Sequence, residues 1–153
     1  MKQRDIQGKI DFFMDNQKKL EHLKKYSFSE FSSNFERADS TIYRLQTSIE
    51  ALLDIARYII SYLGLRVPST SAEVIEILLE EKFITQKDAE QYIQMVGFRN
   101  RVVHEYNSVD IKKLYEILQD DSEDLKNFFT ALLQIINEYE DKENPSNDVR
   151  FFL

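Results

Sequence analysis

One apolar stripe constrains the fold of this chain more than any other feature of its sequence. Apolar side chains recur there at strictly alternating steps of three and four, at Ile42, Leu45, Ile49, Leu52, Ala56, Ile59 and Leu63. That spacing is the period of an α-helix with one apolar face. A stripe about six turns long needs other helices to cover it. The stripe therefore predicts a long helix inside a helical assembly.

Helical spacing continues through most of the chain. We expect a first helix at about 2–25, a loop or short helix at 27–40, a short helix at about 71–82, a helix from about 86 toward 104, and a last helix at about 111–139. These segments predict an all-α fold, an antiparallel bundle of four to six helices.

Local signals mark where these helices begin and end. Thr70 and Glu73 stand three apart before an apolar run, as in a capping box, and Thr85 and Asp88 repeat the pattern. Gly64 is placed as a helix stop, and residues 107–110 are typical of a break followed by a new cap. In the last helix, Asp121 interrupts an otherwise apolar stripe.

Composition agrees with long helices and few turns. The 153 residues include three glycines and two prolines, with 42% hydrophobic and 31% charged residues. We expect one domain over residues 1–140 and a flexible tail over 141–153. No apolar run approaches the ~18 residues of a membrane span, and the N-terminus has no apolar signal core. A cytoplasmic protein without a membrane partner is the expectation.

The chemistry-bearing residues exclude several kinds of site. The chain has no cysteine and two histidines, and neither histidine follows a glutamate by three positions. A di-iron bundle of the Glu-x-x-His type and a histidine–cysteine zinc site are therefore excluded. The three glycines are isolated, so there is no phosphate-binding glycine loop. We expect no cofactor and no metal. The net charge of −7 counts against a general nucleic-acid coat but permits a local basic site.

Two features have ordinary structural interpretations beside functional ones. His22 lies in a strongly charged helix and is expected on the surface. Glu50 and Asp54, four apart, share a helix face and could form a metal site or an acid–base pair. The alternative is that one or both form ion pairs with arginines, within the chain or between subunits.

The stretch "GFRNRVVHEYNSVD", residues 97–110, concentrates reactive side chains. Histidine exchanges protons near neutral pH, and arginine grips phosphate oxygens with its forked donors. RNA carries its own nucleophile, the 2′-hydroxyl, so an arginine and a histidine suffice in principle to cut it without a metal. The structural alternative is a helix end in which Arg101 pairs with Glu105 and His104 favours the helix dipole.

Helix geometry raises an objection to a site on one helix. Arg99 and His104 are five residues apart, which places them ~140° apart around a straight helix. Either the helix changes near His104, or the site is assembled from two chains. A two-fold dimer crossing here brings together two histidines and four arginines.

The string "RNRVVHEY" resembles the HEPN superfamily signature, and more narrowly the Arg-x4-His-x-Tyr motif of HepT toxins, through Arg99, Asn100, His104 and Tyr106. The surroundings, "RLQTSIEALLDIARYII" (44–60), a proline loop, then "MVGFRNRVVHEYNSVD" (95–110), are similar to that family in order and spacing. The resemblance covers roughly residues 40–135.

The resemblance implies a HEPN-type homodimer whose two motifs meet in an interfacial cleft, acting as a metal-independent endoribonuclease on tRNA or mRNA. It implies catalytic roles for Arg99, on the scissile phosphate, and His104, as base or acid. Asn100 would orient one of them, and Tyr106 would assist RNA binding. Arg101 is added on charge alone. The implied antitoxin is an MntA-like nucleotidyltransferase that transfers AMP to Tyr106.

Two other functions stay open on the sequence. The chain could be a non-catalytic HEPN partner that binds a nucleotidyltransferase. It could also be a plain scaffold bundle in which "RNRVVHEY" is a salt-bridged helix end.

Overall fold

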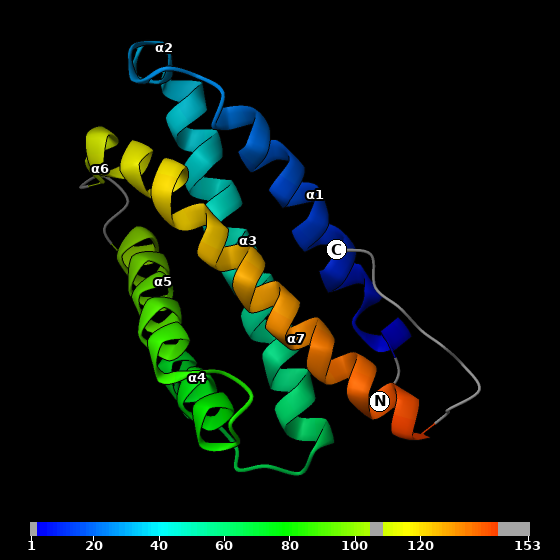
Figure 1. The fold of residues 1–153 in the computed structure, drawn as a ribbon. Coiled ribbons are helices and arrows are strands. Elements are labelled where there is room, and N and C mark those ends of the chain that lie inside the picture. The colour runs from blue at the N-terminus through cyan, green and yellow to red at the C-terminus, as the bar shows by residue number, and fades with distance from the viewer. Residues whose placement is uncertain (1–2, 105–108, 144–153) are drawn as a thin grey trace.

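The computed structural model describes residues 3–104 and 109–143, and every regular element in those ranges is helical. Figure 1 shows the arrangement. A 3₁₀ turn, Gln3–Asp5, precedes α1 (Gln7–Leu23), and then follow α2 (Phe28–Ser32), α3 (Phe35–Tyr62), α4 (Ser71–Glu80), α5 (Gln86–His104), α6 (Ile111–Glu116), a π-helical turn (Ile117–Asp121) and α7 (Ser122–Glu143). The predicted all-α bundle is confirmed.

The stripe that predicted a long helix lies at the centre of the molecule. From Ile42 to Ile59 every stripe residue is buried, and Leu63 is partly buried. In its second half α3 also buries Ala51, Leu53 and Ile60. This helix is therefore covered on several sides, and it packs against α1, α7, α5, α4 and α2 (Figure 1).

The predicted caps and stops are largely confirmed. The Thr70 hydroxyl accepts from the Glu73 amide at 3.1 Å, and the Thr85 hydroxyl accepts from the Asp88 amide at 3.1 Å. The reciprocal half of the first box differs, because the Glu73 carboxylate accepts from the Ser69 amide instead of the Thr70 amide. Gly64 ends α3 with φ +68, a conformation that glycine adopts without strain.

The end of α4 uses the same geometry with a lysine in the glycine position. Lys82 has φ +62, its amide donates to the Leu79 carbonyl at 2.9 Å, and the Phe83 amide donates to the Leu78 carbonyl at 3.0 Å. These two bonds form a Schellman motif, in which the left-handed residue is ordinarily glycine.

Two segments differ from the sequence prediction. Within 27–40, α2 is the expected short helix, but α3 already begins at Phe35, capped by the Asn34 side chain on the Glu36 amide at 2.9 Å. The last helix is divided by the π-helical turn Ile117–Asp121. A π turn inserts a residue and shifts the phase of the helix, which explains why Asp121 interrupted the stripe. Ile111, the first residue of α6, is 41% exposed.

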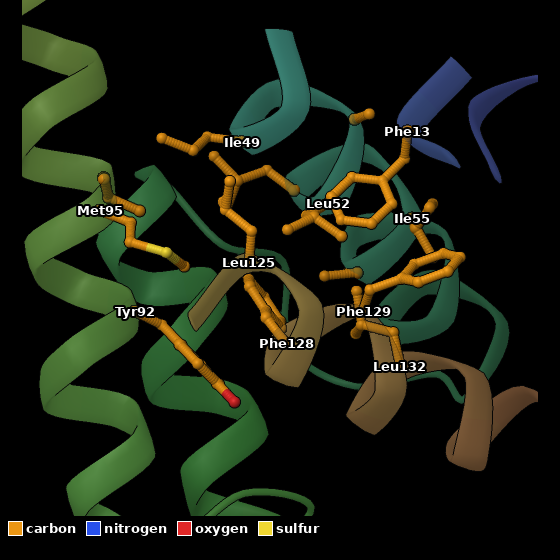
Figure 2. Packing of buried hydrophobic residues seen from close by; sticks show 14 of the residues in the cluster. Phe13, Ile49, Leu52, Ile55, Tyr92, Met95, Leu125, Phe128, Phe129 and Leu132 are labelled. Atoms are coloured by element: carbon orange, nitrogen blue, oxygen red, sulfur yellow. The ribbon is translucent and has the colours of Figure 1, made fainter. Parts of the chain in front are cut away.

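Aromatic pairs join the helices across the core (Figure 2). Tyr92 of α5 stacks on Phe128 of α7 with ring centroids 4.4 Å apart and planes 10° apart. Phe13 of α1 lies 4.4 Å from Phe129 of α7, between centroids. Burial raises the pKa of Tyr92 to about 12, with Asp88 and Asp124 adding to the effect. The first pair holds α5 against α7, and the second holds α1 against α7.

Hydrogen bonds also hold the segment after α5. The Tyr115 hydroxyl donates to the Tyr26 carbonyl at 2.7 Å, and the Gln119 amide group donates to the Lys24 carbonyl at 2.9 Å. Both acceptors lie between α1 and α2, so α6 and the π-helical turn are tied to the end of the bundle that carries α2 (Figure 1). Within the described ranges no helix is long and apolar enough to cross a membrane.

Candidate functional site

Arg99 is fixed by contacts on two sides of its guanidinium group. Its Nε donates to Glu50 Oε1 of α3 at 3.3 Å, and its Nη1 donates to Asn100 Oδ1 at 3.1 Å. The Gln46 amide group donates to the same Glu50 oxygen at 3.3 Å. The Arg99 and Glu50 side chains are 30% and 37% exposed, so the pair joins α3 to α5 where solvent still reaches it. For Nη2, the structure records no partner among the described residues, which leaves donors available for an anion.

Arg101 lies on the opposite side of α5 from Arg99. Two residues along a helix amount to a rotation of ~200°. Arg101 is exposed and borders the hollow between α5 and the α6 segment, whereas Arg99 contacts α3. One copy of α5 therefore presents its two arginines in different directions.

The structure brings together only part of the predicted site. Arg99 and Asn100 are in contact, while Arg101 is separate from them. His104 is the last residue of α5, but its side chain lies outside the described part of the structure. Tyr106 lies in the undescribed segment 105–108, as does Glu105, the partner that the helix-end alternative gives to Arg101.

Ion pairs account for both acidic residues that shared a helix face in the sequence. Glu50 pairs with Arg99, and Asp54 pairs with Lys9 at 3.0 Å and with Arg57 at 3.7 Å. The predicted ion pairs with arginines are thus confirmed for Glu50 with Arg99 and for Asp54 with Arg57. Among the described residues, no group of three histidine, aspartate or glutamate side chains could hold a metal ion.

A hollow of about 570 Å³ lies beside Arg101, on the side of α5 away from Arg99. Residues of α3, α5, α7 and the π-helical turn line it, together with Lys113 of α6. A second hollow, of about 210 Å³, shares Phe98, Arg101, Lys113 and Ile117 with the first. Arg101 and Lys113 therefore stand where the two hollows meet. Asp121 and Asp124 border the larger one.

Sequence reasoning missed most residues of this hollow. Lys113, Asp121 and Asp124 are separated from the motif along the chain, and only Asp121 carried a signal, as the polar break in the last stripe. Burial raises the pKa of Asp121, with a smaller contribution from Asp120, although Lys113 opposes it. Burial likewise raises the pKa of Asp124, reinforced by Asp121, Asp88 and Glu123.

Comparison with known sequences relates this chain to a family of ribonucleases. The model of the family described as "Ribonuclease HepT-like" matches residues 15–132. An mRNA nuclease HepT from Shewanella oneidensis is 32% identical over 104 residues, which are 68% of this chain and 78% of the relative. A tRNA nuclease HepT from Aphanizomenon flos-aquae is 33% identical over 99 residues, which are 63% of this chain and 67% of the relative.

Solved structures agree. A tri-AMPylated Shewanella oneidensis HEPN toxin in complex with an MNT antitoxin superposes with a TM-score of 0.75 at 29% identity, covering 83% of this chain and 95% of that one. YutE from Bacillus subtilis has a TM-score of 0.76 at 19% identity over 96% of both chains, a likeness of fold alone. Because the family match spans the central helix, the motif helix α5 and the first half of α7, this chain belongs to the HepT-like ribonuclease family.

Proposed function

We propose that this chain is the toxin of a HepT/MntA-type toxin–antitoxin pair and acts as a metal-independent endoribonuclease in the cytoplasm. The observation that carries the proposal is the complete motif "RNRVVHEY", residues 99–106, whose first six residues lie in the last turns of α5, in a chain of the HepT-like ribonuclease family. The names of two relatives, an mRNA nuclease and a tRNA nuclease, support RNA as the substrate.

The chemistry needs three actions at one phosphodiester. The RNA 2′-hydroxyl loses its proton and attacks phosphorus, the bond to the 5′-oxygen breaks, and that oxygen gains a proton. His104 takes or gives one of these protons. Arg99 binds the phosphate with the donors that Glu50 and Asn100 leave uncommitted, and Asn100 keeps its guanidinium in place. Arg101 adds positive charge, and Tyr106 assists RNA binding.

We propose that two copies complete the site. On a single α5, Arg99 and Arg101 point in different directions, and the 140° between Arg99 and His104 remains. A homodimer in which two α5 ends meet removes this difficulty, because Arg99 of one copy and His104 of the other reach the same phosphate. It also makes a local basic cleft in a chain of net charge −7.

The charge of a transferred AMP group accounts for how an antitoxin neutralises the toxin. An MntA-like nucleotidyltransferase that transfers AMP to Tyr106 adds a phosphate to the basic cleft, where it pairs with arginine and blocks RNA. The solved complex of an AMPylated HEPN toxin with an MNT antitoxin supports this proposal. Intact mass after co-expression with a cognate transferase tests it. Added AMP on wild type and none on Tyr106→Phe is the expected result, and equal addition on both contradicts it.

Cleavage of bulk tRNA and mRNA in excess chelator tests the ribonuclease proposal. Unmodified wild type cuts RNA, and His104→Ala does not. His22→Ala is the matched control, because His22 is an exposed histidine on α1 whose recorded ring contact is with Tyr26, and it cuts like wild type. If wild type never cuts but binds the transferase tightly, the chain is a non-catalytic partner.

A further inference from the structure

The larger hollow beside α5 is bordered by charges of both signs. Arg101 and Lys113 stand at the end that joins the smaller hollow, and Asp121 and Asp124 border the wall built by the π-helical turn and α7. Within the described residues, the structure records no hydrogen bond or ion pair for the side chain of Arg101 or Lys113. Among the described residues, the donors of both cations are therefore uncommitted, although Lys113 also lies close enough to lower the pKa of Asp121.

The hollow also has apolar lining. Ile49 of α3, Met95 of α5 and Ile117 of the π-helical turn contribute to it, and the amides Gln91 and Gln94 lie at its side. The volume of about 570 Å³ lies within the roughly 300–1,000 Å³ of small-molecule sites. A few polar groups around an apolar surface fix the orientation of a flat ligand, and a π-helical turn is itself frequent at functional sites.

Gly97 lies inside a helix although no neighbouring atom requires a glycine there. Glycine inside a helix costs about 1 kcal/mol relative to alanine, and a Cβ on Gly97 would meet no heavy atom within 4 Å. Gly97 also lines the hollow. The space in front of it is therefore open to a ligand that approaches the helix closely.

The charges match one nucleotide of an RNA strand. A phosphate binds to arginine and lysine, a base packs on apolar surface, and an amino group of the base donates to a carboxylate. Asp121 is exposed and Asp124 is half-buried, and partial desolvation raises the pKa of each carboxyl group, against the effect of Lys113 on Asp121, so holding their charges there has a cost. Such a cost is common where side chains serve binding rather than stability.

We propose that the hollow bordered by Arg101, Lys113, Asp121 and Asp124 binds a nucleotide of the substrate RNA beside the one that is cut. Its phosphate lies on Arg101 and Lys113, and its base presents an amino group to Asp121 and Asp124. The site therefore favours adenine, guanine or cytosine over uracil. This inference rests on the proposed ribonuclease function and adds a base preference to it.

Calorimetric titration of the full chain with AMP, GMP, CMP and UMP tests the proposal. The three amino-bearing nucleotides bind, and UMP binds about 10-fold more weakly because it has no amino group for the carboxylates. Asp121→Ala removes that preference. Equal affinity for UMP and AMP in wild type would overturn the base assignment.

Gly97→Met tests the location without threatening the fold. Methionine is a better helix former than glycine and extends into the open space, so the variant stays folded and loses nucleotide binding at least about 10-fold. Gly8→Met is the matched control, because Gly8 of α1 is also a helical glycine with no heavy atom within 4 Å of its Cβ position. Unchanged binding by Gly97→Met overturns the proposal. If light scattering gives Gly97→Met a different molar mass from wild type, the proposal is also overturned, since a second copy of the chain then covers the hollow.

RNA cleavage measured on the same preparations separates this inference from the proposed function. Wild type that cuts RNA but binds no monophosphate refutes the nucleotide site alone. Wild type that binds the monophosphates as described, but never cuts RNA, supports the site and refutes the ribonuclease.

Discussion

Glu50 positions Arg99, and this role predicts a difference between two substitutions that remove the same charge. Glu50→Gln keeps an oxygen that accepts from Arg99 Nε, whereas Glu50→Ala removes the acceptor. Both variants lose one negative charge, so any general tightening of RNA binding by electrostatics is common to the two. Their comparison isolates the orientation of the guanidinium group.

The expected loss of activity follows from how the two contacts order the arginine. Ordering a free arginine side chain costs up to ~1.5–2 kcal/mol of rotamer entropy, and the Glu50 and Asn100 contacts already order it before RNA binds. Losing most of that corresponds to about a 10-fold fall in kcat/KM for Glu50→Ala. Glu50→Gln keeps an acceptor for Arg99 Nε, so its kcat/KM stays within about threefold of wild type. The small loss arises because the neutral acceptor forms a weaker hydrogen bond.

Stability changes little in either variant. The pair is 30% and 37% exposed, and exposed ion pairs contribute ~0.2–1 kcal/mol, which is at most about 4 °C in Tm for a chain of this size. The assay is single-turnover RNA cleavage at fixed salt, with Tm recorded for each variant. Equal rates for Glu50→Ala and Glu50→Gln would refute the positioning role.

Three further predictions concern stability, all by thermal denaturation. Phe128→Ala lowers the free energy of unfolding by about 3–5 kcal/mol and Tm by about 10 °C or more. Phe35→Ala is the control and changes Tm little, because that ring is 73% exposed. Similar shifts in Tm for both variants would contradict the stacked core pair. Lys82→Gly removes the strain of a φ of +62 and stabilises the fold by about 0.5–1 kcal/mol, whereas Gly64→Lys destabilises it. A loss of stability in Lys82→Gly would contradict this prediction. The raised pKa of Asp124 means that the folded state binds the proton more tightly than the unfolded state, so stability falls as pH rises through the folded pKa. Asp124→Asn therefore raises Tm at neutral pH, the gain disappears in acid, and a pH-independent difference would be contrary to this reasoning.

The sequence predicted elements whose signals are local. The stripe from Ile42 to Leu63 gave the central helix because a 3.6-residue period is visible without knowing its partners. Gly64, Thr70 and Thr85 marked helix ends because each acts within three residues of itself. The start of α3 at Phe35 was missed, since the serines around it are as typical of loops as of caps.

The candidate site was less accessible, because its contacts are not local. Glu50 and Arg99 are 49 residues apart, so sequence could offer an ion pair with some arginine but not this one. The π-helical turn appeared only as an irregularity at Asp121, since inserting one residue breaks the period without saying what replaces it. Lys113 gave no signal at all. The motif itself was recognised through resemblance rather than geometry.

Mixed subunits test most directly the central claim, a ribonuclease site composed from two copies of the motif. Arg99→Ala and His104→Ala, each inactive alone, are co-expressed with different tags, and doubly tagged protein is purified. In each mixed dimer one of two sites keeps both Arg99 and His104, so the purified dimer regains about half of wild-type cleavage. Doubly tagged His104→Ala alone is the control. Restored RNA cleavage is the predicted result. No cleavage by a folded mixed dimer, beside active wild type, would contradict the composite site.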